Sequence, residues 1–356
     1  MEKTVNRKPS VTIAIPVLNE ENFIEDVIQC FLGMGYPNLK EIIIADGGST
    51  DSTIEIVKKL EKKYDKIKLL NNSDKFQSFA LNQMIELAEG EVFLRADGHC
   101  EYDINYIENC VEALLTSNAR NVGGSQRYKA KNVVQSGIAL AVQSFFGNGG
   151  AKYMDQTFEG FGDTVFLGCF WTEDLKKIGG FSTKNVTNQD SELNLRLIEK
   201  YGASSIFITP KIKSWYYPRA NFLDVFKQYF KYGRGRFITS SIHNGEMPFR
   251  TKAPIYLIIT LITFYLIDLI IFKWSLASTA ISLSIISIFI FESIRVCIEM
   301  RKVFDKEIWD GEEDKKPGTL TNIINVFFSI LLINLSYFCG YIYQFLRKNI
   351  LNVEGW

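Results

Sequence analysis

Long apolar segments dominate the carboxy-terminal third of this 356-residue chain and constrain its fold more than any other feature. They comprise residues 253–272, 275–294 and 320–346, and each contains at most one charged residue. A bilayer core of roughly 30 Å is crossed by about 20 helical residues, so each segment is long enough to span a membrane. Buried helices of a soluble domain are the alternative, which three such segments in close succession make unfavourable.

The short connection Lys273–Trp274 predicts that the first two segments form a helical hairpin. Residues 299–319 carry several lysines and arginines, so the positive-inside rule places this loop in the cytoplasm. A third crossing would put Arg347 and Lys348 outside, against the rule, so the third segment could instead re-enter the bilayer or lie at its interface. The first ten residues are polar and show no signal peptide. We therefore expect a multi-pass protein of the cell (inner) membrane with a cytoplasmic amino-terminal domain.

Charge and cysteine usage exclude several function classes. The chain has 40 basic and 40 acidic residues, which gives no reason to expect nucleic-acid binding. Its six cysteines are scattered without CxxC spacing, which argues against a zinc site or a disulfide framework and suits a reducing compartment.

The amino-terminal part alternates between short β-branched runs and amphipathic stretches. Apolar residues at helical spacing follow each run, for example Ile24, Val27, Ile28 and Phe31 after the first. Such alternation predicts an α/β fold with a mostly parallel sheet and helices on both faces. We predict Asn19 as the cap of the first of these helices. The predicted strands cover residues 11–15, 41–45, 67–70 and 91–96.

Carboxylates and small turn residues follow three of these strands. The sequences are Pro16-Val17-Leu18-Asn19-Glu20, Asp46-Gly47-Gly48-Ser49-Thr50-Asp51 and Asp97-Gly98-His99. Because parallel strands end at one edge of a sheet, and ligands bind beyond that edge, we expect these loops to converge. Any one of them alone would be an ordinary turn.

Taken together, these motifs resemble the family 2 glycosyltransferases of GT-A (Rossmann-like) fold. The resemblance covers roughly residues 10–240. Within it, Asp97-Gly98-His99 and the later segment 232–236 resemble the branch that builds succinoglycan-type exopolysaccharides on a lipid carrier. Besides the three loops, it rests on Asn82, Gly90-Glu91, Gly168, Gly179-Gly180-Phe181, Gln189-Asp190-x-Glu192-Leu193-x-Leu195-Arg196 and Tyr232-Gly233-Arg234-Gly235-Arg236.

The resemblance implies a nucleotide-sugar donor, with uridine as the expected nucleoside. Glu20 and Asp46 would hold its base and ribose, and Asp97 would reach a divalent cation, Mn²⁺ or Mg²⁺, on the donor diphosphate. His99 stands where the family usually has a second acid, and an imidazole ligand suits Mn²⁺ better than Mg²⁺. The remaining donor-binding candidates on matching positions are Pro16, Asn19, Gly48, Ser49 and Asn82.

Asp190 is the predicted general base, which would take the acceptor hydroxyl's proton in a single inverting displacement. Asn188 is the expected cap of the helix that carries it. Processive relatives carry Gln-x-x-Arg-Trp, which the segment beginning at Gln228 does not match. The acceptor and its diphosphate are assigned to Gln189, Trp171, Arg234 and Arg236.

The expected organisation is a GT-A catalytic domain over residues 1–220, an interfacial segment over 221–250 and a membrane domain over 251–356 with about three helices. The expected function is transfer of a sugar from a nucleotide-sugar to a polyprenyl-diphosphate-linked saccharide during cell-surface polysaccharide biosynthesis. A processive polysaccharide synthase and a catalytically inactive membrane scaffold are the alternatives. A nucleotidyltransferase would need a glycine-rich basic loop where this chain has 16–20.

Overall fold

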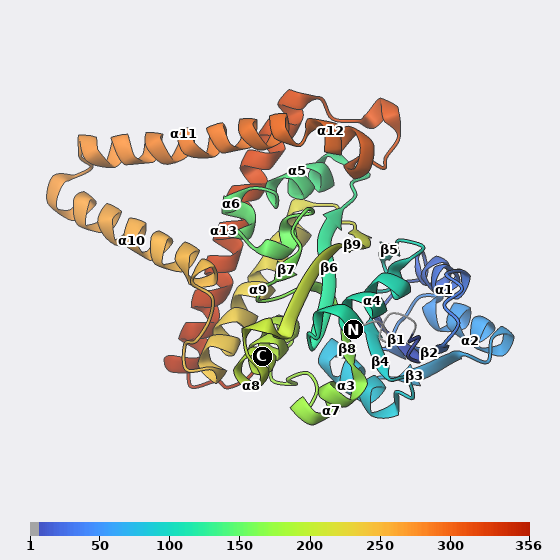
Figure 1. Ribbon diagram of the computed structural model, residues 1–356. Helices are drawn as coiled ribbons and strands as arrows, with labels where there is room; N and C mark the ends of the chain where they lie inside the picture. The colour runs from blue at the N-terminus through green and yellow to red at the C-terminus, as the bar shows by residue number, and fades with distance from the viewer. Residues whose placement is uncertain (1–6) are drawn as a thin grey trace. The chain divides into compact units, whose positions relative to one another are not determined.

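The computed structural model describes residues 7–356 and divides into two compact units (Figure 1). Unit 1 comprises the chain up to Arg127 together with Asp155–Tyr216, and unit 2 comprises Tyr128–Met154 together with Tyr217–Trp356. The structure thus groups residues 128–154 with the carboxy-terminal helices, whereas the sequence reading kept them within residues 1–220.

Unit 1 is built on a nine-stranded sheet with the order β3-β2-β1-β4-β8-β6-β9-β5, and β7 pairs with β9. Strands β3, β2, β1 and β4 are mutually parallel, which confirms the four predicted strands. Beyond β4 the sheet continues with antiparallel pairs that the sequence reading did not predict. The strands are β1 (Val11–Val17), β2 (Leu39–Asp46), β3 (Ile67–Asn71), β4 (Val92–Arg95), β5 (Cys100–Tyr102), β6 (Asn121–Tyr128), β7 (Gly160–Phe161), β8 (Phe166–Trp171) and β9 (Ile206–Tyr216).

The helices of unit 1 form where apolar residues recur at helical spacing. Helix α1 buries the predicted stripe of Ile24, Val27, Ile28 and Phe31 against the sheet. The helices of this unit are α1 (Ile24–Gly33), α2 (Thr53–Lys63), α3 (Gln77–Leu87), α4 (Tyr106–Ser117), α7 (Thr172–Ile178) and α8 (Gln189–Tyr201), with a 3₁₀ turn at Ala203–Ser205.

The prediction of Asn19 as a helix cap is wrong, and Asn188 occupies its predicted cap position without a side-chain capping bond. Helix α1 begins only after Phe23, and the Asn19 amide oxygen accepts a hydrogen bond from Thr50 N instead. Asn188 occupies the cap position of α8 in a left-handed conformation, with no side-chain capping bond. Before α1 the chain takes an extra turn, which moves the Asn19 side chain away from the helix's first amides, whereas at α8 the left-handed backbone of Asn188 replaces the extended conformation usual for a side-chain cap.

Unit 2 is helical. Three of its helices, α10, α11 and α13, are long and apolar enough to cross a membrane, and they coincide with the three predicted segments. The helices are α5 (Val133–Ala141), α6 (Phe145–Asn148), α9 (Phe222–Ile242), α10 (Phe249–Phe272), α11 (Leu276–Glu299), α12 (Arg301–Val303) and α13 (Thr319–Asn349), with short 3₁₀ or π turns at Lys152–Met154, Phe304–Ile308 and Glu313–Lys315.

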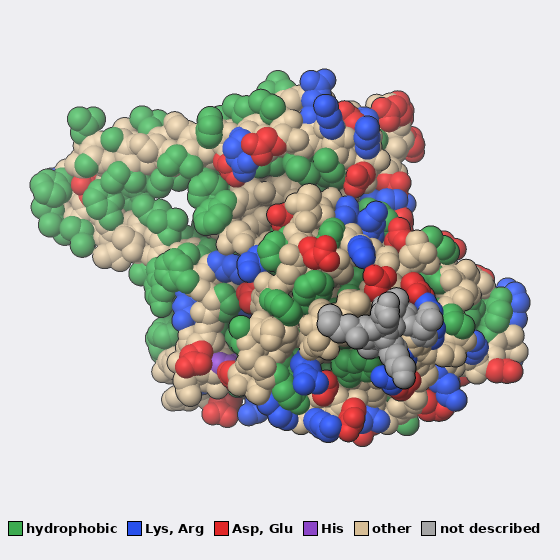
Figure 2. All heavy atoms as spheres, viewed as in Figure 1, with side chains coloured by type: hydrophobic (Ala, Val, Ile, Leu, Met, Phe, Trp, Pro, Cys, Tyr) green, Lys and Arg blue, Asp and Glu red, His purple; other side chains and the backbone are tan. Residues whose placement is uncertain are grey.

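Helices α10 and α11 form the predicted hairpin, whose turn places Lys273 and Trp274 at positive φ. Asp268 on α10 accepts hydrogen bonds from Ser275 N at 2.8 Å and from Ser278 Oγ at 2.7 Å, and so ties the two helices together. Exposed apolar side chains cover both helices (Figure 2), as expected of surfaces that face lipid.

Helix α13 is continuous over 31 residues, or about 46 Å at 1.5 Å per residue. Glycines let α9 pack closely against it: a Cβ on Gly340 would lie 2.8 Å from Phe230 C, and one on Gly233 would lie 2.8 Å from Tyr341 N. Small residues of this kind are typical of close helix pairs in membrane proteins.

Candidate active site

The three polar loops converge at the carboxyl edge of the parallel strands. Val17 O accepts a hydrogen bond from Gly47 N at 2.9 Å, and Asn19 N donates to Ser49 Oγ at 2.8 Å. The loop after β1 therefore lies directly against the loop after β2.

The Asp46 carboxylate shapes the second of these loops. It accepts hydrogen bonds from Gly48 N at 2.9 Å and from Ser49 N at 3.1 Å, and Gly48 adopts a φ of +92° that favours glycine. The side chain is buried, with 3% of its residue surface exposed. Asp46 thus fixes the backbone of the loop after β2, and its carboxylate oxygens are hydrogen-bond acceptors at the site.

The third loop joins the first through His99. Its Nδ1 lies 2.8 Å from Glu20 Oε1. Gly98 permits this approach, because a Cβ there would stand 3.2 Å from both Glu20 Cγ and Val17 Cγ1. The predicted donor-binding and metal-binding loops are therefore in direct contact.

The hydroxyl of Tyr102, the last residue of β5, hydrogen-bonds to the backbone of Asp97. Asp97 N donates to Tyr102 Oη at 2.7 Å, and the Tyr102 hydroxyl lies 3.0 Å from Asp97 O and donates to it. Burial raises the pKa of Tyr102 well above its ordinary value, so the hydroxyl stays protonated and keeps its ability to donate.

Asp190 and Asp97 share one guanidinium, that of Arg95 at the end of β4. Arg95 Nη2 lies 3.2 Å from Asp97 Oδ1, and Nη1 forms an ion pair with Asp190 Oδ1. Burial lowers the pKa of Arg95, but the Asp190 and Asp97 carboxylates outweigh this effect and raise it, so the residue is permanently charged. The two acids predicted from separate motifs therefore face one site.

Sequence reasoning missed Arg95. The available signal was a charged residue inside a run expected to be a buried strand, Val92-Phe93-Leu94-Arg95. A buried arginine needs anionic partners, and its partners here are 2 and 95 residues away along the chain.

Two other predicted ligands support neighbouring elements. The Asn82 amide donates to Phe181 O at 2.8 Å and accepts from Phe181 N at 2.7 Å, which ties α3 to the loop after α7. Gln189 is buried and hydrogen-bonds Gln77 at the start of α3. The hydrogen bonds of both side chains thus join elements of unit 1.

Trp171 lies at the opposite edge of the sheet from Asp97 and Asp190. Because β8 runs antiparallel to β4, its last residue Trp171 pairs with Val92, the first residue of β4. This placement contradicts the assignment of Trp171 to the acceptor, since Asp97 follows the far end of that strand.

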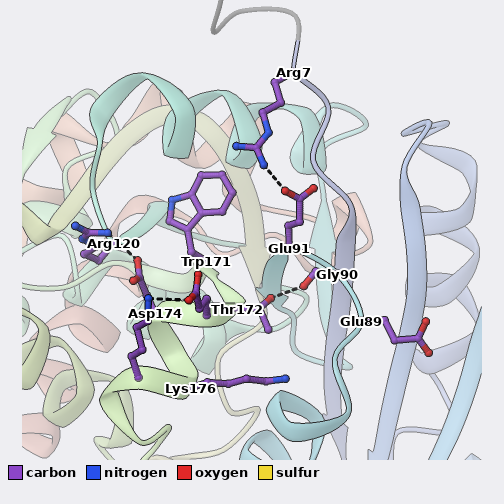
Figure 3. Close-up of a pocket in the computed structure, with 11 residues that line it drawn as sticks. Arg7, Glu89, Gly90, Glu91, Arg120, Trp171, Thr172, Asp174 and Lys176 are labelled. Atoms are coloured by element: carbon purple, nitrogen blue, oxygen red, sulfur yellow. Dashed lines mark hydrogen bonds and ion pairs between the residues drawn. The ribbon is translucent and has the colours of Figure 1, made fainter.

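A cavity of about 650 Å³ surrounds Trp171 at that edge (Figure 3). The Arg7 guanidinium lies over the Trp171 ring and pairs with Glu91, while Arg120 pairs with Asp174 at 3.0 Å. These charged groups neutralise one another within the protein.

Arg234 and Arg236 belong to unit 2. Arg234 Nε donates to Gln344 Oε1 at 2.9 Å, and the guanidinium lies 4.1 Å from the centre of the Trp356 ring. Helix α9 carries both arginines, and its Gly233 lies at the close contact with α13.

The donor set fits a cation that arrives with a ligand and does not fit a resident metal centre. Within residues 7–356 no group of three or more His, Cys, Asp or Glu side chains is arranged to hold a metal ion. Asp97 offers one carboxylate, which is 16% exposed, and His99, two residues later, contacts Glu20 through its imidazole. A divalent ion would need further oxygens, which a diphosphate provides.

Comparison with known proteins gives consistent matches. Residues 12–172 match the family model described as "Glycosyl transferase family 2". The succinoglycan biosynthesis protein ExoA of Rhizobium meliloti (strain 1021) is 34% identical over 248 residues, which cover 69% of this chain and 74% of that protein. A dolichyl N-acetyl-alpha-D-glucosaminyl phosphate 3-beta-D-2,3-diacetamido-2,3-dideoxy-beta-D-glucuronosyltransferase of Methanococcus voltae is 28% identical, covering 75% of this chain and 84% of that protein.

Among solved structures, a mannosyltransferase (PcManGT) from Pyrobaculum calidifontis in complex with GDP-Man and Mn²⁺ has a similar fold. The TM-score is 0.56 at 16% identity, over 93% of this chain and 88% of that one. At this identity the likeness concerns the fold alone.

Proposed function

Since this chain belongs to glycosyltransferase family 2 and is a glycosyltransferase, we propose that it transfers a sugar from a nucleotide-sugar, with UDP as the expected nucleotide, to a lipid-linked saccharide in cell-surface polysaccharide biosynthesis. The observation that carries the proposal is the single guanidinium that contacts both Asp97 and Asp190.

Asp190 is the proposed general base. Arg95 occupies its Oδ1, which orients the carboxylate, and the side chain is 42% exposed, so an acceptor hydroxyl can reach it. The acceptor oxygen forms a bond to the anomeric carbon while the bond from that carbon to the diphosphate breaks. Asp190 takes the hydroxyl proton, the nucleoside diphosphate leaves, and the configuration inverts.

The donor is proposed to lie on the three converging loops. Glu20 and the Asp46 loop would bind the nucleoside, and Asp97, with His99 beside it, would hold a divalent cation, Mn²⁺ or Mg²⁺. When bound, this cation neutralises charge on the leaving diphosphate. The positions of Glu20, His99 and Asp46 in contacting loops support this assignment.

The lipid-linked acceptor is supported by the three apolar helices and by the Methanococcus relative, whose name specifies a dolichyl-linked substrate. We propose a catalytic domain over residues 1–220 on the cytoplasmic face, an interfacial segment over 221–250 and a membrane domain over 251–356. Arg234 and Arg236 are proposed contacts for the acceptor diphosphate.

Isosteric variants test the two acids. Asp190→Asn is expected to reduce transfer by about 10²–10⁴-fold with donor affinity unchanged, because it removes only the base. Asp97→Asn is expected to weaken Mn²⁺-dependent UDP binding as measured by calorimetry.

Glu173→Gln is the matched control, because this exposed carboxylate pairs with Lys177 near the opposite sheet edge. The donor is identified first by screening hydrolysis of UDP-, GDP- and dTDP-sugars with Mn²⁺ and with Mg²⁺. Transfer within tenfold of wild type in Asp190→Asn, with the true acceptor, would contradict the assigned role.

A further inference from the structure

Arg95 is a buried cation between two functional carboxylates. Its side chain is 7% exposed, against 16% for Asp97 and 42% for Asp190. Each terminal nitrogen of the guanidinium contacts a different acid: Nη1 contacts Asp190 and Nη2 contacts Asp97. The separation and relative orientation of the two acids thus depend on one rigid planar group.

The fold accepts a cost to keep the guanidinium in this orientation. Arg95 Nε is buried with no hydrogen-bond partner among the described residues. An unsatisfied buried donor is unfavourable, and such exceptions concentrate at functional sites. The terminal edge of the guanidinium, with Nη1 and Nη2, faces the two acids, and this orientation leaves the Nε–H without a partner.

We propose that Arg95 is a positioning residue of the transfer reaction: its guanidinium holds the base Asp190 at a fixed place beside Asp97, and it limits how tightly Asp97 binds a cation. This inference rests on the proposed roles of the two acids.

Removing the Arg95 guanidinium is therefore expected to lower turnover and to raise the affinity for a divalent cation. Without the fork, the base loses its fixed orientation, so turnover falls, because misplacement by about 1 Å can cost on the order of 100-fold. Without the positive charge, Asp97 is no longer neutralised by a neighbour, so a divalent cation binds on the order of tenfold more tightly.

The test uses the full chain with Arg95→Met, which removes the charge at similar length, and Arg95→Lys, which keeps the charge but removes the fork. Arg120→Met is the matched control, because Arg120 also pairs with an aspartate but lies at the other edge of the sheet. The measurements are the Mn²⁺ concentration for half-maximal UDP binding by calorimetry, kcat and donor KM, and the unfolding temperature.

For Arg95→Met we expect the half-saturating Mn²⁺ concentration to fall about tenfold while kcat falls at least tenfold. For Arg95→Lys we expect Mn²⁺ dependence and donor KM within about threefold of wild type, with kcat still reduced at least tenfold. Arg120→Met should change neither the half-saturating Mn²⁺ concentration nor kcat. A residue with only a structural role would weaken metal binding and turnover together with stability.

An unchanged or higher half-saturating Mn²⁺ concentration in folded Arg95→Met would overturn the proposal. Full turnover in Arg95→Lys would overturn it as well. If Arg95→Met does not fold, the turnover of Arg95→Lys decides. The outcome is distinct from failure of the proposed function: Asp190→Asn with near-normal transfer refutes the function itself, whereas an inactive Asp190→Asn beside a fully active Arg95→Lys refutes only the role of Arg95.

Discussion

Replacing Gly233 by alanine should destabilise unit 2 by a measurable amount. The new Cβ would lie 2.8 Å from Tyr341 N and closer still to Tyr337 O, whereas ordinary contacts begin at 3.4 Å. Both neighbours are backbone atoms of α13, so no side chain can rotate away and the helices themselves must separate. Overpacking of this kind costs about 1–3 kcal/mol, and backbone contacts favour the upper end.

Alanine is a better helix former than glycine by about 1 kcal/mol, which offsets part of that cost. The net destabilisation is therefore about 2 kcal/mol, or roughly 4–8 °C in unfolding temperature for a unit of this size. Thermal unfolding of the detergent-solubilised protein measures it. UDP binding below the transition should be unchanged, because the donor loops belong to unit 1.

Gly33→Ala is the matched control, since a Cβ on this helical glycine of α1 has nothing within 4 Å. It should leave stability unchanged or raise it by up to about 1 kcal/mol. A Gly233→Ala protein as stable as wild type would show that α9 and α13 do not pack as closely as the structure describes.

Further outcomes follow from the same contacts. Asn82→Ala should lower stability by about 1–3 kcal/mol through loss of both bonds to Phe181 while leaving the UDP dissociation constant within about threefold, as measured by thermal unfolding and calorimetry. Trp171→Phe should leave kcat unchanged, and a loss above tenfold would restore Trp171 to the acceptor site. Asp268→Ala should lower the unfolding temperature by freeing Ser275 and the hairpin turn. Chelation of divalent cations should abolish transfer and weaken UDP binding, with recovery on adding Mn²⁺.

Local sequence patterns predicted much of unit 1 and the long helices of unit 2. The stripe from Ile24 to Phe31 and the β-branched runs marked helices and strands correctly, because their periodicity reflects which faces are buried. The antiparallel strands were missed. Strand β6 contains Gly123 and Gly124 among polar residues, so it lacks the apolar signal of a buried strand.

The part of the site that lies at the ends of the parallel strands could be predicted from the sequence. The loops that carry Glu20, Asp46 and Asp97 meet because β1, β2 and β4 are parallel and end at one edge. The prediction for Trp171 was wrong because β8 runs antiparallel to β4, and the local sequence of β8 does not indicate its direction.

The sequence alone determined which segments could be buried, which could cross a membrane and which loops carry chemistry, because these properties depend on residue type and short-range spacing. Only the tertiary structure decided that Arg95 joins Asp97 to Asp190, that Asn82 braces a turn and that Gly233 lies at a helix contact. These outcomes depend on strand direction and on partners as far apart in the chain as Gly233 and Tyr341, information that local periodicity does not contain.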